Sequence, residues 1–178
     1  MTESEALTVK DYLPLIGVVL GGVLAMVGGF FSNLWLEYRR ERKMRETLAL
    51  AFQGEIEALL EIIAKRGYIE GLRKAKAQTE QTGAIHGYHF RARRKYFSVY
   101  EANVGQIGLL RPPLSRFVAR FYTQANAILE DMERFEEAEP SKIEPADAIA
   151  AYEEVLSIAE DTVAVGGQIV SEIARRYK

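Results

Sequence analysis

The chain contains no cysteine, and this absence excludes a disulfide framework, a thiol nucleophile and any zinc site with cysteine ligands. Its only histidines are His86 and His89. It has no Glu-x-x-His motif, which places the ligands of a di-iron centre in helical bundles. Gly-rich phosphate loops after a strand and Gly-x-Ser-x-Gly motifs are also missing. The sequence therefore predicts no enzyme, no cofactor and no metal site.

A long uncharged segment is the most prominent feature that is present. Residues 13–36, LPLIGVVLGGVLAMVGGFFSNLWL, contain no acidic or basic side chain and no histidine. A helix rises about 1.5 Å per residue and a bilayer core is about 30 Å thick, so about 20 apolar residues can cross it. This pattern predicts a single N-terminal transmembrane helix at 13–36, between a short external tail at 1–12 and a domain at 37–178.

Basic residues are distributed unequally around that segment. Only Lys10 precedes it, whereas five basic residues follow it within ten positions: Arg39, Arg40, Arg42, Lys43 and Arg45. The positive-inside rule then predicts an inner-membrane protein with its N-terminus outside and its C-terminal domain in the cytoplasm. Lipid headgroups are the expected contacts of these five residues and also of Arg175, Arg176 and Lys178 at the end of the chain.

Small residues recur every fourth position in the uncharged segment, at Gly17, Gly21, Ala25 and Gly29. They fall on one face of a helix. In lipid, helices associate where small side chains let two backbones approach closely. We expect this face to pair with a second copy of the chain or with another membrane protein.

The remainder of the chain shows helical periodicity and no alternation typical of strands. Apolar residues with spacings of three and four predict helices at 41–76, 91–110, 114–135 and 149–177. Gly67 and Gly71 are expected to kink or end the first of these helices, and residues 78–87 are expected to form a loop. The predicted fold is all-α, a transmembrane helix followed by an antiparallel four-helix bundle.

Charge divides this domain into two parts. Residues 37–120 carry 17 basic and 9 acidic side chains, whereas residues 121–178 carry 5 and 13. Opposite net charges of this kind most simply attract each other across a bundle.

Basic and aromatic residues alternate at 86–97, where Arg91, Arg93, Arg94 and Lys95 stand among tyrosines and phenylalanines. Three interpretations compete. The basic residues can bind an anion or single-stranded nucleic acid, with the rings stacking on bases. The two histidines can contribute to a metal site, which would be incomplete without further ligands. The simplest interpretation, pairing with acidic residues at 130–137, is preferred, and nucleic acid is not the expected partner.

The segment Val99–Leu110, VYEANVGQIGLL, followed by Phe121 and Tyr122, resembles a segment of small bacterial single-pass membrane proteins with a cytoplasmic helical domain. The resemblance implies location but no activity. Gly105 and Gly108 lie three apart, and this spacing predicts close approach of a neighbouring helix or ring.

These observations predict a membrane-anchored helical interaction module, an oligomeric scaffold or accessory subunit. Its expected partners are lipid, a second copy or another membrane protein, and a cytoplasmic protein. One alternative is a pore-forming or membrane-perturbing effector assembled through the glycine face, although Ser32 and Asn33 would be its only polar lining. The other is anion or nucleic-acid contact through the 86–97 segment.

Overall fold

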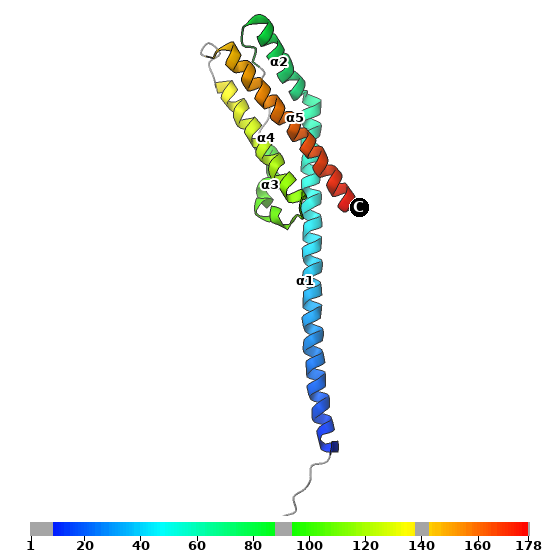
Figure 1. The fold of residues 1–178 in the computed structure, drawn as a ribbon. Helices are drawn as coiled ribbons and strands as arrows, with labels where there is room; N and C mark the ends of the chain where they lie inside the picture. The colour runs from blue at the N-terminus through cyan, green and yellow to red at the C-terminus, as the bar shows by residue number, and fades with distance from the viewer. Residues whose placement is uncertain (1–8, 88–93, 138–142, 178) are drawn as a thin grey trace, which may run out of the picture. The chain divides into compact units, whose positions relative to one another are not determined.

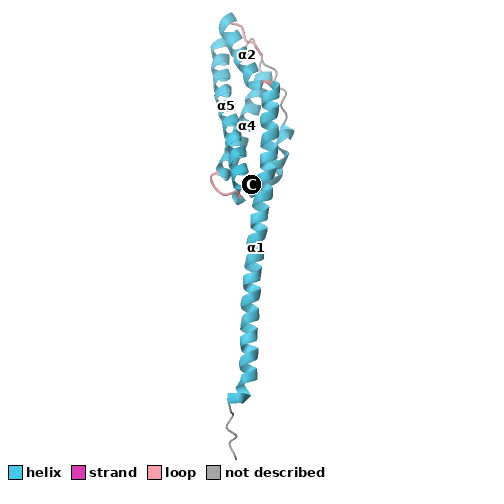
Figure 2. Ribbon diagram, turned by 90° about the vertical axis from the view of Figure 1, so that its right-hand side faces the viewer, coloured by secondary structure: helices cyan, strands magenta, loops and turns pink. Residues whose placement is uncertain are grey.

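The computed structural model describes residues 9–87, 94–137 and 143–177, and every regular element in these ranges is a helix (Figures 1 and 2). For residues 9–20, 23, 25, 94, 95, 136 and 137 it describes only the backbone. The elements are α1 (Val9–Arg66), α2 (Tyr68–Thr82), η1 (Arg94–Phe97), α3 (Ser98–Asn103), η2 (Val104–Leu109), α4 (Leu114–Glu137) and α5 (Pro145–Arg176). The all-α prediction is confirmed for these ranges.

The chain forms two compact units, residues 1–44 and residues 45–178, and α1 contributes to both. In the portion of the chain searched, no helix combines the length and the apolar character needed to cross a bilayer. The transmembrane helix predicted at 13–36 is therefore contradicted, and with it the single-pass inner-membrane location and the outside position of the N-terminus.

The described side chains of this segment begin at Gly21, and charged residues begin at Glu37. The 16 uncharged residues between these limits are fewer than the roughly 20 that cross a bilayer core. The correction therefore concerns the described part of the segment.

A left-handed glycine separates α1 from α2, as the sequence predicts. Gly67 has φ +61°, a conformation that costs a side-chain-bearing residue about 1–2 kcal/mol. Its amide donates to the carbonyl of Ala64 at 3.2 Å, and its own carbonyl accepts from the amide of Gly71 at 2.8 Å. The helix ends and restarts within one residue, and Gly71 remains helical. The loop predicted at 78–87 is shorter than expected because α2 continues to Thr82.

The second half of the unit 45–178 confirms two of the four predicted helices and contradicts one. Helices α4 and α5 coincide closely with the segments predicted at 114–135 and 149–177. The long helix predicted at 91–110 is wrong, because its described part is divided into the short elements η1, α3 and η2. The predicted antiparallel four-helix bundle is therefore wrong in its second helix. Over the described residues, the long helices that pack together are the α1–α2 pair, α4 and α5, with α5 lying against both α4 and α2 (Figures 1 and 2).

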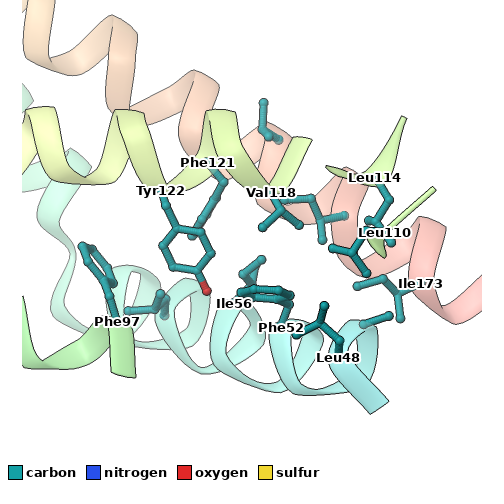
Figure 3. Close-up of a cluster of buried hydrophobic side chains, with 14 of the residues drawn as sticks. Leu48, Phe52, Ile56, Phe97, Leu110, Leu114, Val118, Phe121, Tyr122 and Ile173 are labelled. Atoms are coloured by element: carbon teal, nitrogen blue, oxygen red, sulfur yellow. The ribbon is translucent and has the colours of Figure 1, made fainter. Parts of the chain in front are cut away.

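Two clusters of buried apolar side chains stabilise this bundle. The first joins α1 to η1, α4 and the C-terminal half of α5, and its members include Phe52, Ile56, Phe121 and Ile173 (Figure 3). The second joins α2 to α4 and the N-terminal half of α5 and is centred on Leu72. The two clusters therefore stack along the bundle.

Glycine allows α5 to approach its neighbours closely at one point. A Cβ built on Gly166 would lie 2.9 Å from Cε2 of Phe121 and 3.0 Å from Cδ2 of Leu60, whereas one on Gly167 would meet nothing within 4 Å. Gly105 and Gly108 in η2 also have open space around them, so the close approach predicted there is wrong.

Ion pairs cross the bundle with the polarity that the charge division predicts. Arg73 and Lys76 of α2 pair with Glu160 and Glu153 of α5 at 2.5 and 2.8 Å. Arg120 of α4 pairs with Asp161 at 2.5 Å. Because these side chains are largely exposed, each pair contributes at most about 1 kcal/mol and mainly favours the observed pairing of helices.

Candidate functional site

A carboxylate on α1 holds the segment that replaces the predicted second helix. One oxygen of Glu55 accepts hydrogen bonds from the amide of Val99 at 2.6 Å and from the hydroxyl of Ser98 at 3.4 Å. The other accepts from the amide of Tyr100 at 3.1 Å and from the hydroxyl of Tyr122 at 2.5 Å. Glu55 thus accepts hydrogen bonds from the amides at the start of α3, although it lies in a distant part of the chain.

The phenol of Tyr122 is the buried part of this arrangement. Tyr122 has no exposed surface. Its ring stacks on that of Tyr100, with centroids 4.0 Å apart, and lies edge-on to that of Phe97, with centroids 5.5 Å apart. Figure 3 shows the ring extending from α4 toward α1 beside Phe121. Burial and then the bond to Glu55 raise the pKa of Tyr122 well above its ordinary value. The neutral phenol is therefore strongly favoured, and its role is to donate a hydrogen bond.

This junction around Glu55 positions a segment: its carboxylate accepts from two backbone amides and two hydroxyls, and the phenol of Tyr122 keeps its proton. Sequence analysis did not identify it. Glu55 directly precedes the buried Ile56 and follows Phe52 by three residues, so its place at the edge of an apolar helix face was the only available signal.

The unit 1–44 presents a different kind of surface, formed by apolar side chains without protein around them. Leu24, Met26, Phe30, Phe31 and Trp35 are each more than half exposed. The rings of Phe30 and Phe31 lie edge to face, with their centroids 6.2 Å apart. Large exposed apolar surfaces of this kind mark interaction sites in most proteins.

Comparison with known proteins adds no further assignment. No family model, curated protein or solved structure matches the chain. The resemblance of Val99–Leu110 to small bacterial membrane proteins stays a prediction, and the function must be inferred from the geometry.

The residues predicted to pack in the glycine face have no neighbour where the structure describes them. A Cβ on Gly21 or Gly29 would meet no atom within 4 Å. The side chains of Gly17 and Ala25 lie outside those that are described. Pairing through this face stays a prediction.

The basic residues after the uncharged segment are exposed and lie on the surface of α1. This applies to Arg39, Arg40, Arg42 and Lys43, whereas Arg45 is half-buried and has a partner. The guanidinium of Arg39 lies over the ring of Trp35, 3.7 Å from its centroid, a favourable cation–π geometry. No contact of the described residues tests the headgroup contacts predicted for this group, which stay a prediction.

At the other end of the chain, the predicted headgroup contacts already have protein partners. Arg175 and Arg176 both donate to the carboxylate of Glu172, at 2.8 and 2.5 Å. Arg176 also donates to the carbonyl of Pro112 at 3.2 Å. Arg176 therefore connects the end of α5 to the turn before α4, whereas Arg175 pairs within α5. Lys178 lies outside the described residues.

The basic and aromatic cluster is not assembled into a site by the described side chains. Arg91 and Arg93 lie outside the described residues, and only the backbone is described for Arg94 and Lys95. His86 is half-buried, and its ring nitrogen Nε2 lies 3.0 Å from the hydroxyl of Thr82. In the searched part of the chain, no three metal-ligating side chains gather. His89 was outside that search, so neither its role nor anion contact at 91–95 is tested.

Proposed function

We propose that the chain is a helical interaction module that self-associates through the exposed apolar side chains of its N-terminal unit. Five of these side chains recur along α1 with spacings of three and four residues and define an apolar seam. They are Leu24, Val27, Phe31, Leu34 and Tyr38, with exposed fractions of 70, 46, 66, 47 and 56%.

The spacing is the observation that supports this proposal. Residues three and four apart alternate along one side of a helix, and in coiled coils such positions insert between the side chains of a facing helix. A second copy carries the same seam and is therefore complementary to it in a symmetric dimer. Burial contributes about 25 cal/mol for each Å² of apolar surface removed from water, and four of the five side chains are large aliphatic or aromatic groups with little polar area.

The seam and the glycine face diverge along α1. At 100° per residue, Gly21 lies only about 60° from Leu24, whereas Gly29 lies about 160° from Phe31. The two faces therefore offer different contacts to a second copy, one through large side chains and the other through small residues. Substitutions can separate them. The pore-forming alternative required the contradicted transmembrane helix and is not retained.

Sedimentation velocity on the full chain over a range of concentrations tests the proposal. We expect a concentration-dependent dimer or higher oligomer in the parent protein, and a shift to monomer when Phe31 and Leu34 are both replaced by serine. Met26→Ser is the matched control, because Met26 is 76% exposed but lies off the seam, and it should leave the oligomer unchanged. Gly21→Ile tests the glycine face in the same assay.

Three results would contradict self-association through the seam. One is a parent protein that stays monomeric at every concentration, and another is an oligomer that survives the double substitution. The third is a monomer that sediments with phosphatidylcholine vesicles, because lipid would then be the partner of these apolar side chains.

A further inference from the structure

The two buried clusters of the unit 45–178 do not fill all the space between them. A cavity of about 80 Å³ lies where they meet, bordered by the end of α1, the start of α2, η1, α4 and α5. Leu59 and Phe121 of the first cluster form part of its wall, and Leu72 and Ala159 of the second form another part. It adjoins the helix break at Gly67, because Tyr68 also lines it.

Carbon atoms form almost all of the wall, because the few polar groups of the lining residues have partners elsewhere. Arg66 donates to the hydroxyl of Tyr68 at 2.6 Å and to that of Tyr96 at 3.5 Å. The hydroxyl of Thr162 donates to the carbonyl of Ile158 at 2.7 Å. These hydroxyls are the few polar groups of the wall, and they are too few to give a water molecule the several hydrogen bonds that a buried water normally makes.

Partly exposed residues border one side of the cavity. Ile62 and Ile63 near the end of α1, and Val163 on α5, are half-buried, whereas Leu72 and Phe121 are completely buried. The cavity is therefore partly open on this side, and a molecule can enter it past these aliphatic side chains.

We propose that this cavity is a binding site for one small apolar molecule. An engineered apolar cavity of about 150 Å³ stays dry and binds benzene or xenon. The cavity here has about half that volume and the same kind of wall, so it suits xenon or a short hydrocarbon and excludes a substituted ring. It requires no contribution from the N-terminal unit and is independent of self-association.

Methyl-resolved NMR of the full chain under xenon pressure tests this site. We expect saturable shifts confined to methyl groups of Leu59, Leu72 and Ile128, and no saturable shift in Ala159→Leu, where the larger side chain occupies the cavity. The filled variant should also melt at a higher temperature. Ala148→Leu is the control: Ala148 is buried on the same helix but does not line the cavity, so this variant should melt lower and retain the xenon response.

A second variant keeps the test informative if Ala159→Leu does not fold. Leu72→Ala enlarges the cavity, and benzene should then raise its melting temperature while leaving that of the parent protein unchanged. Shifts that rise linearly with pressure across the whole chain would overturn the proposal. So would xenon saturation that persists in a folded Ala159→Leu, or a Leu72→Ala variant with no benzene response.

Discussion

Removing the Glu55 carboxylate should destabilise the unit 45–178 severely. In Glu55→Ala the amides of Val99 and Tyr100 and the hydroxyl of Tyr122 lose their acceptor. Losing the partner of helix-start amides costs about 1–2 kcal/mol. A buried hydroxyl without a partner costs about 1–3 kcal/mol. The expected total is about 3 kcal/mol, a large share of the roughly 5–15 kcal/mol that stabilises a typical domain.

Urea unfolding followed by circular dichroism measures this loss as a change in the free energy of unfolding. Glu57→Ala is the matched control, because Glu57 is exposed on the same helix and accepts an exposed hydrogen bond from Gln53, so its effect should stay within about 0.5 kcal/mol. Glu55→Gln keeps an acceptor oxygen but removes the charge, and we expect an intermediate loss.

A double-mutant cycle separates the phenol from the rest of the junction. Tyr122→Phe alone should cost about 1 kcal/mol, whereas in the Glu55→Ala background it should cost nothing or stabilise, since it removes an unpaired hydroxyl. A loss below about 1 kcal/mol in Glu55→Ala, or strictly additive effects of the two substitutions, would refute the assigned role of Glu55.

Three further predictions concern packing and pH. Gly166→Ala should lower the free energy of unfolding by about 1 kcal/mol, because a Cβ there would lie too close to its neighbours. Gly167→Ala should raise the free energy of unfolding by about 0.5–1 kcal/mol, because alanine has the higher helix propensity. Equal effects of the two substitutions in urea unfolding would contradict the tight contacts at Gly166. Burial raises the pKa of Tyr122, so the contribution of this phenol to stability is complete below about pH 10 and falls at higher pH. Titration of phenolate absorbance should show one tyrosine that ionises only on unfolding. Hydrogen bonds from Arg175, and to a lesser extent from Arg176, lower the pKa of Glu172. This carboxylate therefore stabilises the fold above about pH 4.5 and loses that effect as the pH falls. Glu172→Gln should make the free energy of unfolding depend less on pH in the acid range.

Helices with a continuous apolar face were predictable from the sequence, and the physical reason is that packing and periodicity agree along them. In α5, Tyr152, Leu156 and Ile173 repeat at helical spacing and are all buried. The end of α1 at Gly67 was also predictable, because a glycine between two helical stretches often ends a helix.

The predictions failed where the local sequence pattern is compatible with more than one structure. Apolar spacing at 91–110 fits a helix, but the Glu55 junction and two exposed glycines favour short turns instead. That junction depends on a carboxylate more than forty residues away, which no local pattern encodes. The uncharged run at 13–36 predicted a transmembrane helix, whereas no helix in the described part of the chain has the length and apolar character to cross a bilayer.

The position of the only tryptophan decides what fluorescence of this chain can report. Trp35 belongs to the unit 1–44, is half exposed and lies beside Arg39, so its emission is set by that local environment. Association along the seam should shift this emission to shorter wavelengths while the bundle stays folded. Denaturation of the unit 45–178 should change the tryptophan emission very little. Tryptophan fluorescence therefore reports association, and tyrosine fluorescence reports folding.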